Sequence, residues 1–121
     1  MEPILLVLTN LPDSESARSL ACRLVQSRLA ACVNLMPGVQ SIYHWQGVVE
    51  QATEVTLLIK TTQRQYHQLE QEIVANHPYE VPEVIALPVT DGHAPYLHWV
   101  IAGASAGTSA GSSSDVPSDH A

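Results

Sequence analysis

The feature that most constrains the fold is a pair of long strand-like segments joined by one turn. Residues 32–44 and 53–61 are rich in apolar and β-branched residues, which favours extended backbone. Gly47 lies between them and marks a turn, whereas Pro37, followed by glycine, predicts a bend or bulge in the first segment. Residues 50–52 predict a second irregularity before the return strand. A hairpin of this length would overhang a small sheet, so another chain is expected to cover its edges.

Two elements precede this hairpin. The apolar run at residues 4–9 predicts a central strand that is buried on both faces. Apolar residues then recur at three- and four-residue steps over residues 13–29, which indicates an amphipathic helix with its arginines facing solvent. Asp13 is the expected N-cap of this helix, because a carboxylate there accepts from a free backbone N–H of the first turn.

Three further elements follow the hairpin. Thr62 and Gln65 fit a capping box that starts a second helix, and Pro78 forbids its continuation. Residues 81–90 contain two prolines and therefore predict an edge strand or a broken one. The stretch APYLHWVIAG has helical apolar spacing and predicts a short closing helix.

The predicted order is β-α-β-β-α-β followed by a C-terminal helix. This order is typical of an α+β, ferredoxin-like sandwich, in which two helices cover one face of the sheet. The domain is expected to span residues 1–103, and the Ser/Gly/Ala-rich residues 104–121 are expected to form a disordered tail. This fold carries many different functions, so the chemistry must be argued from particular residues.

Composition excludes several classes of function. The net charge is −7 and only five residues are Lys or Arg, which is the wrong balance for nucleic-acid binding. No apolar stretch has membrane-spanning length and no basic signal-peptide start is present, so we expect a cytoplasmic protein with no membrane contact. The two cysteines match neither a zinc site nor a disulfide framework. No catalytic motif is recognisable, and we expect no enzymatic activity.

The segment HPYEVPE, residues 77–83, combines a histidine with two glutamates. Imidazole and carboxylate ligands suit copper(II) and zinc. If residues 79–83 are extended, Glu80 and Glu83 point to opposite faces, so only one of them can share an ion with His77. A closed site would then need ligands from elsewhere in the chain or from a neighbouring subunit. The structural alternative is a histidine that complements the dipole of a helix end.

Other residues allow two interpretations each. Cys32 is either a small buried apolar residue or a soft ligand and reactive thiol. Tyr43 and Trp45, at the end of the hairpin, either pack against a second copy of the chain or form a ligand platform. Glu54 and Lys60 lie an even number of residues apart, so they either share a function on one sheet face or are simply solvated charges.

Several segments in this order resemble the CutA family of divalent-cation tolerance proteins. They are RLAACVNLMPGVQSIYHWQG, EVTLLIKTT, NHPYEVPEVIALPV and YLHWV, and the resemblance runs from about residue 3 to residue 102. It implies a cytoplasmic homotrimer with a ferredoxin-like fold, in which long hairpins wrap neighbouring subunits as in the PII signalling proteins. The family is associated with tolerance to copper and other divalent metals.

The resemblance also implies roles for single residues. His77 matches the family's HPY histidine and is the metal-ligand candidate, with Glu83 beside it. Asn76 and Thr9 stand where some members have a further histidine and a cysteine, so Cu²⁺ or another divalent cation is expected to bind only weakly. Five more residues match positions that are expected to line an intersubunit cleft: Cys32, Trp45, Glu54, Lys60 and Tyr79.

The expected function is therefore that of a homotrimer in the response to divalent metal ions, with weak copper(II) or zinc binding and no cofactor required for folding. The alternative is a small-molecule sensor, like PII or ACT domains, that acts on an unknown partner protein. A third alternative is a stable scaffold whose trimer is itself the function.

Overall fold

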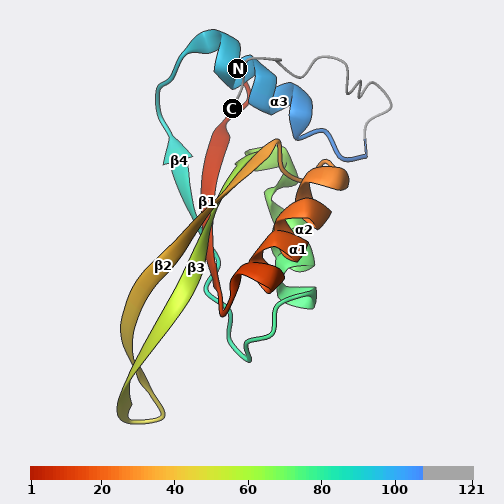
Figure 1. Ribbon diagram of the computed structural model, residues 1–121. Coiled ribbons are helices and arrows are strands. Elements are labelled where there is room, and N and C mark those ends of the chain that lie inside the picture. The colour runs from red at the N-terminus through yellow and green to blue at the C-terminus, as the bar shows by residue number, and fades with distance from the viewer. Residues whose placement is uncertain (108–121) are drawn as a thin grey trace.

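The computed structural model describes residues 1–107, which fold around one antiparallel sheet (Figure 1). The elements are β1 (Ile4–Leu11), α1 (Ser14–Gln26), β2 (Cys32–Trp45), β3 (Val48–Thr62), α2 (Gln63–Ala75), β4 (Ile85–Val89) and α3 (Ala94–Gly103). The strand order in the sheet is β2-β3-β1-β4, and every neighbouring pair is antiparallel. This is the ferredoxin-like topology that the sequence predicts.

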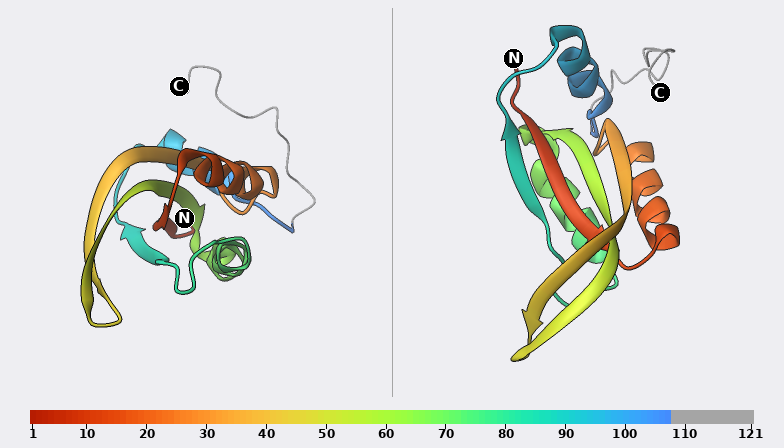
Figure 2. Two further views of the ribbon diagram at one scale, coloured as in Figure 1. Left: turned by 60° about the horizontal axis from the view of Figure 1, so that its bottom comes forward. Right: turned by 60° about the vertical axis from the view of Figure 1, so that its left-hand side comes forward.

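Helices α1 and α2 pack on the same face of the sheet, as the right panel of Figure 2 shows. Alternate residues of each strand point to this face because side chains in a strand alternate between its two sides. The core between the helices and the sheet contains fully buried apolar side chains, among them Val7, Leu24, Leu57, Ile59, Leu69 and Ile73. Within residues 1–107, no helix combines the length and the apolar character needed to cross a bilayer.

The opposite face of the sheet, which we call the open face, is also apolar. Leu6 lies directly opposite Leu87, and Leu8 lies directly opposite both Ile85 and Leu58. Ile85 and Leu87 are 50% and 44% exposed. Helix α3 contacts β1 and β3 at the end of the molecule away from the hairpin tip (Figure 1). Large apolar side chains beyond α3 therefore face solvent in the single chain.

Helix α1 begins as predicted but ends earlier. Asp13 Oδ1 accepts from the backbone N–H of Ser16 at 2.8 Å, which confirms the N-cap. The helix ends at Gln26 rather than at residue 29, because Arg28 adopts a left-handed φ of 62°. Arg28 is half-buried and donates to Ser105 at 3.3 Å, so the prediction that all arginines of this segment face solvent is wrong for Arg28.

The predicted capping box of α2 is wrong. The side chain of Thr62 makes no capping hydrogen bond, and its buried hydroxyl has no partner among the residues that the structure describes. Gln65 is buried and donates instead to the carbonyl of Ala106 at 3.0 Å. A free backbone N–H in the first turn of α2 is satisfied by the start of the chain, where Glu2 Oε2 accepts from the N–H of Arg64 at 3.1 Å.

The hairpin is longer and more regular than predicted. The bulge is confirmed, because the β2–β3 register shifts between Met36 and Val39. The second irregularity, at residues 50–52, is absent, and β3 already begins at Val48. Gln46 and Gly47 form a two-residue turn with φ of 51° and 83°, which matches the twist of paired strands. The paired strands curve strongly as they leave the sheet (Figure 2).

The C-terminal part of the domain agrees with the predicted edge strand. β4 pairs with β1 and lies at the edge of the sheet, although it starts at Ile85 and not at residue 81. Residues 104–107, which the sequence assigns to a tail, contact the domain: Ala104 is 4% exposed, and the N–H of Ala106 donates to the carbonyl of Arg28 at 3.0 Å. The rest of that predicted tail, residues 108–121, lies outside the described residues.

Candidate functional site

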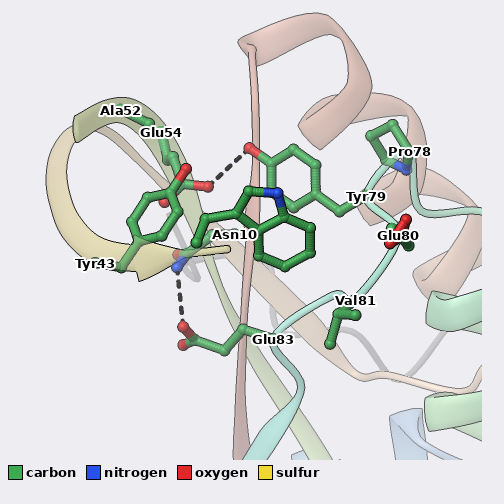
Figure 3. Close-up of a pocket in the computed structure, with 10 residues that line it drawn as sticks. Asn10, Tyr43, Ala52, Glu54, Pro78, Tyr79, Glu80, Val81 and Glu83 are labelled. Carbon is green, nitrogen blue, oxygen red and sulfur yellow. Dashed lines mark hydrogen bonds between the residues drawn. The ribbon is translucent and has the colours of Figure 1, made fainter. Parts of the chain in front are cut away.

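A cavity of about 580 Å³ lies where the hairpin, the end of β1 and the loop of residues 77–84 meet (Figure 3). We call it the hairpin cleft. Its lining residues are Asn10, Tyr43, Trp45, Ala52, Glu54, Pro78, Tyr79, Glu80, Val81 and Glu83. Its volume is in the range of pockets that bind small molecules.

The hairpin supplies one wall of the cleft. Directly opposed residues share a face of an antiparallel pair, and the register opposes Tyr43 to Glu50 and Trp45 to Val48. Strand alternation then places Tyr43, Trp45 and Glu54 on the same side of the hairpin. Tyr43 and Trp45 are 44% and 40% exposed, so the aromatic part of this wall is accessible in the single chain.

The loop of residues 77–84 supplies the facing wall. It bends at residues 78–81 and does not form a strand. The prediction that Glu80 and Glu83 point to opposite faces is therefore wrong, because both glutamates line the cleft. Asn10, in β1, holds the loop by donating from Nδ2 to Glu83 Oε1 at 3.3 Å (Figure 3).

The carboxylate of Glu54 is the most buried charged group of the cleft. Glu54 is only 7% exposed, and its Oε2 accepts from the hydroxyl of Tyr79 at 2.7 Å. Burial raises the pKa of Tyr79, and the hydrogen bond to Glu54 and its charge raise that pKa further. The salt bridges within residues 1–107 join other groups, so no basic side chain there forms a salt bridge with Glu54. The cleft thus holds a buried negative charge without a positive partner.

His77 supports the loop from behind and does not line the cleft. Its Nε2 donates to the carbonyl of Asn10 at 2.8 Å, and its Nδ1 accepts from the N–H of Tyr79 at 3.2 Å. Burial lowers the pKa of His77, against the opposing effects of the Asn10 hydrogen bond and the Glu54 charge. Because both ring nitrogens are engaged, a metal ion at His77 would have to replace one of these backbone hydrogen bonds.

Cys32 and Lys60 form a separate group. They lie opposite each other in the β2–β3 pair, and Lys60 Nζ donates to Cys32 Sγ at 4.0 Å and to Asn34 Oδ1. Burial raises the pKa of Tyr96 of α3, and Cys32, which lies against it, raises that pKa further. Lys60 is six residues from Glu54 along β3, a distance of about 20 Å in a strand.

Four of the seven predicted site residues therefore line one cleft within the chain: Trp45, Glu54, Tyr79 and Glu83. That Cys32 and Lys60 join them across a subunit boundary stays a prediction. Within residues 1–107, no group of three or more His, Cys, Asp and Glu side chains has the arrangement of a metal site. What the cleft offers chemically is carboxylates and aromatic faces, which attract positive charge.

Sequence reasoning missed Asn10, which belongs to this site. Its role depends on the pairing of β1 with β3, which places it opposite Thr56, whose hydroxyl donates to Asn10 Oδ1 at 2.6 Å. The amide of Asn10 is thereby oriented so that Nδ2 faces Glu83. The one available signal was a polar residue next to the end of an otherwise apolar central strand.

Fold and site together define a ferredoxin-like domain with an acidic, aromatic-lined cleft beside a long hairpin. The chain belongs to the CutA1 divalent ion tolerance protein family, whose family model matches residues 5–102. The resemblance seen in the sequence is thereby confirmed.

Relatives support this membership in sequence and in structure. The divalent-cation tolerance protein CutA of Thermus thermophilus is 49% identical over 94 residues, which cover 78% of this chain and 91% of the relative. The chloroplastic protein CutA of Arabidopsis thaliana is 46% identical over 98 residues, but the matched region spans only 54% of that relative. The solved Thermus thermophilus structure superposes with a TM-score of 0.82 at 45% identity, covering 84% of this chain and 99% of that one. CutA1 from Oryza sativa gives a TM-score of 0.80 at 41% identity, covering 82% and 91%.

Proposed function

We propose that this protein is a non-enzymatic, cytoplasmic homotrimer that acts in the response to divalent metal ions, and that the hairpin cleft is its ligand site. The observation that carries the proposal is the carboxylate of Glu54, which is buried beside Tyr79 without a basic partner in residues 1–107. An uncompensated buried charge is costly, and such groups concentrate at binding sites.

The open face supports the homotrimer. Ile85 and Leu87 expose large apolar surface there, and monomeric proteins seldom leave such a contiguous patch uncovered. The hairpin adds backbone edges that project beyond the sheet and favour pairing with another chain (Figure 1). Light scattering at micromolar concentration tests this: we expect three times the chain mass, and a monomeric mass would overturn the proposed architecture.

The metal-binding part of the proposal places Cu²⁺ or Zn²⁺ at Glu83, which lines the cleft, and at His77, which must first leave its position behind the loop. We expect weak binding, because His77 must give up a backbone hydrogen bond and further ligands must come from a neighbouring subunit. Calorimetric titration with copper(II) should show weaker binding to His77→Ala than to the wild type. His67→Ala is the matched control, because His67 is exposed on α2. Equal isotherms for the wild type and His77→Ala would remove His77 from the site.

A second candidate function is a small-molecule sensor that signals to a partner protein. The shape of the cleft favours it, because about 580 Å³ with aromatic walls suits a small organic ligand better than a bare ion. A thermal-shift screen with metabolites, nucleotides and divalent metals separates the two functions. Stabilisation by a metabolite alone would favour the sensor, and stabilisation by metals alone would favour the metal-binding function.

A further inference from the structure

We propose that the hairpin cleft binds a small organic cation, an ammonium or guanidinium group carried on a short aliphatic or aromatic body. This inference rests on the proposed function, in which the cleft is a ligand site, and it names the chemical class of the ligand. Its three supports are the charge of the cleft, the nature of its walls and the arrangement of its hydrogen-bond acceptors.

The charge of the cleft is one-sided. Glu54, Glu80 and Glu83 all line it, and no Lys, Arg or His is among its lining residues. Glu54 is nine-tenths buried, so solvent compensates its carboxylate poorly. Within the cleft of one chain, a cation supplies the missing counter-charge, whereas an anion would meet only repulsion.

The walls suit an organic cation. Tyr43, Trp45 and Tyr79 line the cleft, and the face of an aromatic ring attracts a cation within about 6 Å of its centroid. Pro78 and Val81 add apolar surface that can contact the body of the ligand. A bare divalent ion makes little use of such walls, and the part of the chain that the structure describes holds no group of three metal-binding side chains.

The acceptors match the donors of an ammonium or guanidinium group. The Tyr79 hydroxyl gives its hydrogen to Glu54 Oε2, which leaves the phenol oxygen able to accept from a ligand. Glu54 Oε1 and Glu83 Oε2 accept no hydrogen bond from residues 1–107. A charged N–H donor in the cleft thus finds charge-assisted partners on both walls, from the hairpin and from the loop.

Calorimetry on the full chain in its native oligomer tests the inference with phenethylamine and its neutral isostere 2-phenylethanol. We expect phenethylamine to bind at least about tenfold more tightly, the factor expected for a hydrogen bond to a charged group. Glu54→Gln should remove that preference. Asp91→Asn is the matched control: it removes one charge at an exposed position in the loop between β4 and α3, outside the cleft lining, and should leave the affinity unchanged.

Two further variants keep the test decisive if Glu54→Gln folds poorly. Glu83→Gln alters an exposed side chain and should weaken phenethylamine binding several-fold. Trp45→Leu should abolish the fluorescence change that phenethylamine causes, while Trp99, which stacks on Tyr96 in α3, remains as the reference.

The outcomes separate this inference from the proposed function. Equal affinity for the amine and the alcohol, the result expected if Lys60 of a neighbouring subunit already neutralises Glu54, overturns the organic cation. An amine affinity unaffected by Glu83→Gln overturns it as well. If copper(II) or zinc binds and phenethylamine does not, the inference fails and the metal-binding function stands. If neither metals nor any small molecule bind the native oligomer, both fail.

Discussion

The hydroxyl of Tyr79 donates a 2.7 Å hydrogen bond to Oε2 of Glu54 and so joins the loop after α2 to the long hairpin (Figure 3). The two residues are 25 positions apart, and within residues 1–107 no other side-chain hydrogen bond joins this loop to β3. Because Glu54 is nearly buried, this one contact both stabilises a charged group and closes one side of the hairpin cleft.

Tyr79→Phe should destabilise the protein, because it leaves the buried carboxylate of Glu54 without its donor. The expected loss in free energy of unfolding is roughly 1–3 kcal/mol, measured by urea denaturation. In the Glu54→Gln background the same change should cost less, since a neutral amide is less costly to leave unpaired. Equal costs in the two backgrounds would show that the Tyr79–Glu54 bond does not stabilise the charge.

The stability should fall in mild acid because of His77. Its pKa lies below the usual 6.5, chiefly because of burial, so the folded protein favours the neutral ring. Below pH 6.5 the unfolded chain binds this proton more readily, and stability is lost as the pH falls through the folded pKa. At and above neutral pH the contribution is complete. Protonation would also place a hydrogen on Nδ1 of His77, which now accepts a hydrogen bond from the backbone N–H of Tyr79. The two N–H groups would then face each other and the hydrogen bond would be lost.

Urea denaturation between about pH 7 and pH 5 measures this dependence. His77→Gln should flatten it, whereas His67→Gln, at an exposed position on α2, should leave the slope as in the wild type. A slope that is unchanged in His77→Gln would assign the acid sensitivity to other groups.

The sequence predicted those parts of the fold that depend on local chemistry. Asp13 caps α1 because a carboxylate at that position reaches a free N–H within the same turn. Pro37 with its following glycine interrupts the regular pairing of β2 with β3 and produces the bulge. Such features need no knowledge of distant residues. The capping box at Thr62 failed because distant groups compete: Ala106 accepts from Gln65, and the chain start satisfies the first turn of α2.

The site was predicted only in part for the same reason. The residues Trp45, Glu54, Tyr79 and Glu83 were named, but their meeting depends on the curvature of the hairpin and on a bent loop. A period-two argument placed Glu80 and Glu83 apart, because it assumed a strand where the chain bends at residues 78–81. Sheet register, which sequence spacing does not reveal, brings Asn10 into the site and, within one chain, keeps Lys60 away from it.

A charge on the open face should dissociate the proposed homotrimer. Ile85→Glu places a carboxylate among Leu6, Leu8 and Leu87, where association would bury it without a partner. Val74→Glu is the matched control, because Ile85 and Val74 are both 50% exposed but Val74 lies on α2. Sedimentation should show a smaller species for Ile85→Glu alone. If Ile85→Glu keeps the mass of the wild type, the open face is not the subunit interface.

A side chain at the left-handed position of the hairpin turn should destabilise the protein. Gly47 has φ of +83°, and a Cβ there would meet no atom within 4 Å, so Gly47→Ala adds backbone strain without a clash. We expect a loss of about 1 kcal/mol in free energy of unfolding, measured by urea denaturation. Gly92→Ala tests a steric clash in place of backbone strain, because its Cβ would lie 2.9 Å from Cδ2 of Leu97. A stability of Gly47→Ala equal to the wild type would show that the turn relaxes.

Two buried threonines should respond in opposite ways to the same substitution. Thr9 and Thr61 are both fully buried, but the hydroxyl of Thr61 donates to the carbonyl of Leu29 at 2.7 Å, whereas that of Thr9 has no partner within residues 1–107. Thr9→Val removes an unsatisfied polar group and should raise the free energy of unfolding by about 1 kcal/mol. Thr61→Val leaves the Leu29 carbonyl without its donor and should lower it by about 1–2 kcal/mol. Urea denaturation of both variants gives the two signs, and destabilisation by Thr9→Val would mean that its hydroxyl is satisfied in the assembled protein.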